Sequence, residues 1–76
     1  MDISQYDVQI KNHVFIRALQ RGIHPDLIEN TLCKGRIRRY GENCIKFVSK
    51  GSKRTIICVG RIDGSKIVIL TIEEGN

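Results

Sequence analysis

Apolar residues follow two different spacings along the chain, and the spacing changes at Gly35. Before this glycine, one stripe at helical spacing holds four apolar residues, Val14, Phe15, Ala18 and Leu19. After it, apolar and polar residues tend to alternate, with the period of two that is typical of strands. The pattern therefore predicts helices in the first half of the chain and a sheet in the second half.

Local signals place the ends of two helices. Asn12 is suited to the N-cap of the first helix, and Gly22 is suited to end it, because glycine readily adopts the left-handed conformation found there. The second helix is expected to begin at Pro25, with His24 at its cap, and to end at Gly35. The link between the helices is very short, which predicts an angled helix pair.

Four strands are expected after the helices, over residues 36–40, 44–50, 54–62 and 66–73. Gly51-Ser52 is suited to a turn, and Asp63-Gly64 is a strong hairpin signal between two strand-like segments. Strands joined by such short turns pair antiparallel with their neighbours in the sequence. Residues 6–10 also alternate, and either a short edge strand or an extended lead-in fits them.

These elements predict a single α+β domain over residues 1–76, with two N-terminal helices packed on a four-stranded antiparallel β-meander. A chain of 76 residues buries only a thin core, so we expect no second domain. The first residues are acidic and polar, unlike a secretory signal. The longest aliphatic run, residues 67–70, is far too short to cross a membrane, so no membrane partner is expected.

The net charge of +5 is concentrated in the middle of the chain. Residues 34–66 hold ten basic and two acidic residues, a local net charge of +8. Such a segment predicts a polyanionic partner or an acidic protein partner, although a merely soluble lysine-rich surface would also fit. Three cysteines without a C-x-x-C pair argue against a disulfide framework and against a zinc site, which favours the cytoplasm. Acidic pairs suited to metal chemistry are absent, and so are G-x-G-x-x-G and P-loop patterns, so neither a metal nor a nucleotide cofactor is expected.

The first predicted helix carries three groups suited to phosphate chemistry. His13, Arg17 and Arg21 are each one turn apart, which places an imidazole and two guanidinium groups along one face. The neighbouring positive charges favour a neutral imidazole, which can accept a proton from a ribose 2′-hydroxyl. Arginine can bind a phosphate through two hydrogen bonds and stabilise the charge that develops on it. A solvated polar helix face is the alternative interpretation.

A second set of candidates lies on the predicted strands. Six cations and one aromatic residue are expected to contact an RNA backbone and its bases: Arg36, Arg38, Arg39, Tyr40, Lys46, Lys50 and Arg61. The alternative is that cations on edge strands only deter aggregation between sheets. Thr71 could present its hydroxyl to a phosphate, but a threonine on the last strand also fits simple β-propensity.

Segment 13–23 has the pattern H-x3-R-x3-R-G-I, and the last predicted strand contains I-V-I-L-T-I at 67–72. Together with the second helix between them, these motifs resemble a widespread uncharacterised prokaryotic domain family placed near the RelE-type toxins and the barnase–EndoU–colicin ribonuclease superfamily. The resemblance implies a RelE/barnase-like fold and RNA cleavage, often within a toxin–antitoxin pair. It also implies His13, Arg17 and Arg21 as active-site residues, with Thr71 as a further candidate.

Three hypotheses about function follow. The protein is a small metal-independent ribonuclease or a toxin-like relative of one, with RNA or the ribosome as its target. Alternatively, it is a non-catalytic module that binds RNA, the ribosome or an acidic antitoxin-like protein. A third hypothesis is a structural or oligomerisation domain with a basic surface. Convergence of His13, Arg17 and the strand lysines on one surface favours the first two hypotheses, and a His13 turned away from the basic sheet removes the first.

Overall fold

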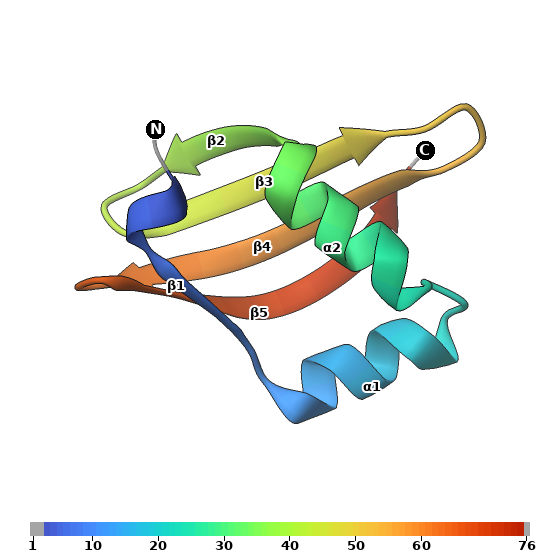
Figure 1. The fold of residues 1–76 in the computed structure, drawn as a ribbon, viewed down its shortest axis with the longest axis horizontal. Helices are drawn as coiled ribbons and strands as arrows, with labels where there is room; N and C mark the ends of the chain where they lie inside the picture. The colour runs from blue at the N-terminus through green and yellow to red at the C-terminus, as the bar shows by residue number, and fades with distance from the viewer. Residues whose placement is uncertain (1–2, 76) are drawn as a thin grey trace.

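The computed structural model describes residues 3–75, in which two helices cover one face of a five-stranded sheet (Figure 1). The elements along the chain are η1 (Ile3–Gln5), β1 (Asp7–Ile10), α1 (Asn12–Gln20), α2 (Pro25–Lys34), β2 (Arg36–Tyr40), β3 (Cys44–Lys50), β4 (Thr55–Asp63) and β5 (Lys66–Gly75). In space the strands follow the order β1-β5-β4-β3-β2.

The predicted four-stranded antiparallel meander is wrong, because β1 joins the sheet and does so in parallel. Asp7 pairs with Lys66 and Ile10 with Ile69, so β1 occupies the edge beside β5 and precedes both helices. The remaining strands pair antiparallel with their sequence neighbours. The partners of β1 lie 59 positions along the chain, and a four-residue alternation carries no signal for such a distant partner.

The helix ends follow the predicted signals only in part. The first helical residue is Asn12, while Lys11 holds the cap position and makes no side-chain cap bond, so the predicted N-cap is wrong by one residue. The His24 ring accepts a 3.1 Å hydrogen bond from the backbone N–H of Asp26, and Pro25 opens α2 as predicted. Gly22 adopts a left-handed φ of 79°, which lets the chain turn sharply into α2.

The core lies between the helices and the sheet. Along β3, Ile45 and Phe47 are fully buried, whereas Lys46 between them is exposed. Because side chains alternate along a strand, we call the helix-packed side of the sheet the covered face and the other side the open face. The predicted buried stripe of α1 is narrower than expected, since Ala18 is buried but Leu19 is 42% exposed.

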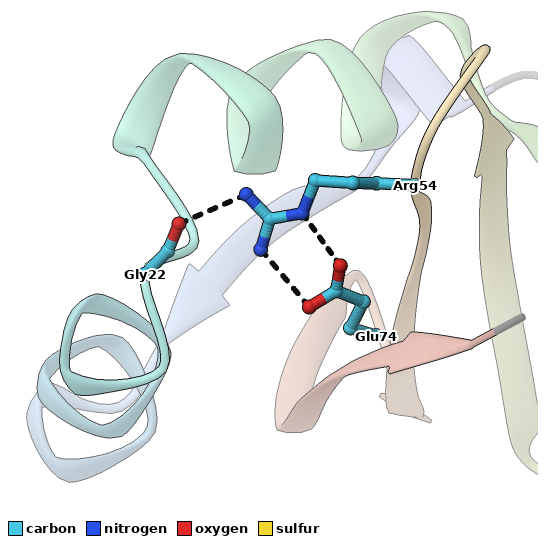
Figure 2. Close-up of polar contacts among 3 residues, drawn as sticks. All are labelled: Gly22, Arg54 and Glu74. Atoms are coloured by element: carbon cyan, nitrogen blue, oxygen red, sulfur yellow. Dashed lines mark hydrogen bonds and ion pairs between the residues drawn. The ribbon is translucent and has the colours of Figure 1, made fainter.

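Arg54 connects three segments that are distant in the sequence, the β3–β4 loop, the turn between the helices and the end of β5 (Figure 2). The guanidinium of Arg54, in the β3–β4 loop, donates to both carboxylate oxygens of Glu74 at 2.6 and 3.1 Å, and to the carbonyl of Gly22 at 3.0 Å. This ion pair lowers the pKa of Glu74, mainly through the hydrogen bond from Arg54. The contact holds the turn between the helices against the end of β5.

Candidate functional site

In Figure 1, α1 lies beside β5. A small hollow of about 80 Å³ is lined by residues of both elements. We call it the helix–edge hollow, and it is lined by His13, Val14, Arg17, Arg21, Leu70, Thr71 and Ile72. All four residues predicted as catalytic therefore line one hollow, although they come from opposite ends of the chain. No carboxylate is among the lining residues, so the positive charge of the hollow is not neutralised there.

The two arginines of this hollow are in different states. Arg21 donates from Nη1 to the backbone carbonyl of Ile72 at 3.2 Å, across 51 positions of sequence. That bond pins the guanidinium to the edge of β5 and satisfies a carbonyl that β1 does not reach. The exposed Arg17 forms no hydrogen bond or ion pair with residues 3–75, so its guanidinium can turn to an incoming anion. Arg17 is therefore the better placed of the two to bind a phosphate.

A β-bulge shapes the strand side of the hollow. Val59 lies opposite Thr71 and Gly60 opposite Ile69, so Leu70 is the extra residue on β5. The bulge leaves Leu70 42% exposed, and half-buried Thr71 falls in line with the open face. The sequence did not predict that Leu70 and the Ile72 carbonyl belong to the hollow. Gly60 could have indicated the bulge, because a glycine inside a strand often marks one.

Six of the seven predicted RNA-contacting residues share the open face. The register places Arg36, Arg38, Tyr40, Lys46, Lys50 and Arg61 on this side, because paired residues point the same way. Arg39 alternates to the covered side, yet it contributes to a hollow on the open face. The acidic residues on this face lie on other strands or at its far end: Glu73 on β5, Asp63 at the end of β4 and Asp7 on β1. The open face is therefore strongly cationic over β2 and β3.

The hollow on the open face measures about 480 Å³, and Tyr40 is one of its lining residues. We call it the Tyr40 hollow, and it is lined by Arg38, Arg39, Tyr40, Lys46, Val48 and Ile57. The Lys46 ammonium lies 5.2 Å from the centroid of the Tyr40 ring, within cation–π distance. A second depression, lined by Arg36, Val48 and Lys50, shares Val48 with it. The lining thus combines cations with apolar side chains.

The two hollows are connected by one row of the sheet. Arg38, Lys46, Val59 and Thr71 lie opposite one another on consecutive strands of the open face. At the ordinary spacing of strands, Thr71 lies about 10 Å from Lys46 along this row. The helix–edge hollow therefore opens beside the basic face, with Thr71 belonging to both surfaces.

A third hollow lies on the helix side and has a different character. It measures about 450 Å³ and is lined by Val8, Ile10, Phe15, Pro25, Ile28, Glu29, Leu32 and Cys33. We call it the apolar groove. Its lining holds no cation, so it does not suit a polyanion.

No protein family, curated protein or solved structure matches this chain. The resemblance to the RelE-related family consequently rests on the short motifs alone. In the part of the chain that the structure describes, no three His, Cys, Asp or Glu side chains gather as a metal-binding set. No helix in residues 3–75 has the length and apolar character needed to span a membrane.

Proposed function

We propose that this protein is a cytoplasmic RNA-interacting protein that cleaves RNA at the helix–edge hollow without a metal ion. One observation carries the proposal: His13, Arg17, Arg21 and Thr71 line the same hollow. A base, a phosphate ligand and a hydroxyl donor are the groups that such a cleavage needs. The cationic open face beside the hollow supplies a surface for the rest of the RNA.

The chemistry assigns one role to each side chain. The neutral imidazole of His13 accepts the proton of a ribose 2′-hydroxyl, whose oxygen then attacks the adjacent phosphorus. The P–O bond to the 5′-oxygen breaks, and the imidazolium returns its proton to that leaving oxygen. The products are a 2′,3′-cyclic phosphate and a 5′-hydroxyl. Arg17 binds the phosphate oxygens, Thr71 donates a hydrogen bond to them, and Arg21 adds positive charge from its fixed position.

A non-catalytic binding module is the second candidate, and the distribution of charge favours it. Six predicted RNA-contacting residues lie on the open face, and none of them lines the hollow that holds His13. Such a surface can bind RNA, the ribosome or an acidic antitoxin-like protein with no reaction. In that case the helix–edge hollow only anchors α1 to β5 through Arg21 and Ile72.

Incubation of the purified protein with end-labelled random-sequence RNA in excess chelator separates the two candidates. Catalysis predicts cyclic-phosphate products, and a loss of about 100-fold or more in rate for His13→Ala. Gln20→Ala is the matched control, because Gln20 is exposed on the same helix and lies outside the hollow. Equal rates for the wild type and His13→Ala would remove the histidine from the mechanism. Binding without any cleavage would support the module.

A further inference from the structure

We infer that the Tyr40 hollow binds one unpaired nucleotide, so that the RNA crosses the open face as a single strand on its way to the helix–edge hollow. The inference rests on the proposed function, to which it adds a substrate class and a second subsite. It is carried by the contacts around Tyr40 and by the row of residues that joins the two hollows.

The Tyr40 hollow has the apolar surface that a nucleobase requires. Tyr40 is 42% exposed, which leaves part of its side chain open for stacking. Val48 and Ile57 are half-buried, line the same hollow, and pair with each other on the row beyond Arg38 and Lys46. Stacking on an aromatic side chain is the usual way in which proteins hold an unpaired base. A base within a duplex is stacked on its neighbours and cannot enter such a hollow.

The lining of the same hollow has the charge that flanking phosphates require. Arg38 and Lys46 are paired residues of β2 and β3, and both line the hollow. No acidic residue lines the hollow, so these charges remain available to an anion. The position of the Lys46 ammonium over the Tyr40 ring also keeps cation and ring together, as a nucleotide with both a base and a phosphate needs.

The path of the single-stranded RNA across the sheet follows from the pairing register of the β-strands. Arg38, Lys46, Val59 and Thr71 form one row across the sheet, and this row ends at the helix–edge hollow. A single strand along this row would place one phosphate near Lys46 and a later one near Arg17 and Thr71. The step of about 10 Å between Lys46 and Thr71 is short enough for a few nucleotides to cover.

An acidic protein is a less suitable occupant of this surface. Carboxylates would pair with Lys46 and Arg38, but they would leave the exposed ring and the lining residues Val48 and Ile57 without an apolar partner. A nucleotide supplies both an anion and a flat apolar base in the same unit. The combination of cations around an aromatic ring therefore favours single-stranded RNA over a purely acidic ligand.

The test measures binding separately from cleavage. A fluorescein-labelled 2′-O-methyl oligonucleotide lacks the attacking hydroxyl, so it reports binding alone, and its anisotropy is followed over a series of salt concentrations. We expect the single strand to bind more tightly than the duplex of the same sequence. Tyr40→Leu should weaken single-strand binding about 5- to 100-fold, whereas Tyr40→Phe should retain most of it. Equal affinity for the single strand and the duplex, or wild-type affinity of Tyr40→Leu, would overturn the inference.

Charge controls complete this experiment. Lys46→Ala should weaken binding and reduce the salt slope of log K by about 0.7, the value for one lost contact to a single strand. Lys34→Ala removes the same charge from α2, on the opposite side of the sheet, and should leave affinity and slope unchanged. If Lys34→Ala reduces binding as much as Lys46→Ala does, attraction is only to net charge and the inference fails. Displacement of the oligonucleotide by polyglutamate at equal charge concentration would assign the face to an acidic protein instead.

The outcomes also distinguish this inference from the proposed function. Tyr40-dependent binding of the single strand, with no cleavage of ordinary RNA, would keep the Tyr40 subsite and reject the reaction. His13-dependent cleavage, with unchanged binding by Tyr40→Leu, would keep the reaction and reject the subsite. Because Tyr40 is partly exposed on an edge strand, both of its variants are expected to fold, and thermal unfolding checks this directly.

Discussion

The two faces of the sheet are built from alternate residues of the same strands, and they differ in almost every property. On the covered face, Ile45 and Phe47 of β3 and Cys58 of β4 are fully buried against the helices. On the open face, Lys46 is exposed and its neighbour Val48 is half-buried, beneath no other element of the described chain. One strand therefore contributes to the core on one side and to a cationic surface on the other.

Because the two faces differ in this way, different residues determine the stability of the fold and the binding of a ligand. Stability depends on the covered face, where each side chain is surrounded by apolar neighbours. Ligand contact depends on the open face and on the edge beside α1, where cations are in water. A substitution on one face should therefore leave the property of the other face nearly unchanged.

The largest expected effect is the difference in stability between substitutions at two adjacent residues of β3, Phe47 and Lys46. Phe47→Ala should lower the free energy of unfolding by about 3–5 kcal/mol, because it leaves a cavity in a thin core. Lys46→Ala should change it by no more than about 0.5 kcal/mol, because that side chain is exposed. Urea unfolding measures both variants. If Phe47→Ala does not fold, Ile45→Val should still cost about 1 kcal/mol. Similar losses for Phe47→Ala and Lys46→Ala would contradict the difference between the faces.

At the edge where the faces meet, Arg17 of α1 and Arg21 at the C-cap of this helix should behave differently. Arg21→Ala should cost about 1 kcal/mol of stability, because it removes the bond to the Ile72 carbonyl. Arg17→Ala should leave stability unchanged, and if the proposed reaction takes place it should reduce RNA cleavage about 100-fold, since in that proposal the guanidinium binds only the substrate phosphate. Thermal unfolding and initial cleavage rates give the two readouts. A stability loss for Arg17→Ala equal to that of Arg21→Ala would show that Arg17 also holds the fold.

Two neighbouring glutamates of β5, one on each face, should differ in how their substitution changes stability with pH. The lowered pKa of Glu74 means that its pair with Arg54 stabilises the fold above the unfolded pKa of about 4.3. This contribution is lost as the pH falls through the lower, folded pKa. Glu74→Gln should therefore be less stable than wild type at neutral pH and equally stable at low pH. Glu73→Gln, on the open face, is the control and should differ little from wild type at either pH. A constant difference for Glu74→Gln would contradict this account.

The smallest expected effect is a difference in thiol reactivity. Burial raises the pKa of the Cys58 thiol to about 12, whereas Cys44 lies half-buried on the open face. A thiol reagent at pH 8 should modify Cys44 and the exposed Cys33 in the native protein, but Cys58 only after denaturant is added. Mass spectrometry after proteolysis locates the labels. Modification of Cys58 at the rate of Cys44 would show that the covered face opens readily.

Local signals were enough to predict the antiparallel strands but not the whole sheet. Gly64 adopts a left-handed φ of 60° in the predicted Asp63-Gly64 turn, and alternation along β3 matches its two faces. The pairing of β1 with β5 joins residues that no local pattern connects, so the predicted fold class was wrong. Exposure of Leu19 had a similar cause, because the width of a buried helical stripe depends on what the helix packs against.

The candidate site was predictable as a set of residues but not as an arrangement. Helical spacing alone placed His13, Arg17 and Arg21 along one side of α1. The position of Thr71 beside them depends on the bulge at Gly60 and on the path of α1 along β5. The bond from Arg21 to Ile72 is likewise a tertiary contact, so the different roles of the two arginines could not be inferred from their spacing.

Amide chemical-shift mapping with the uncleavable 2′-O-methyl single strand tests the central claim most directly. We predict shifts in two groups, residues 13–21 with 70–72 around the helix–edge hollow, and residues 36–48 around the Tyr40 hollow. Amides of α2 that border the apolar groove, such as those of Glu29 and Cys33, should not move. Shifts confined to the apolar groove, or shifts around Tyr40 with none at 70–72, would contradict a single RNA path that joins the open face to the helix–edge hollow.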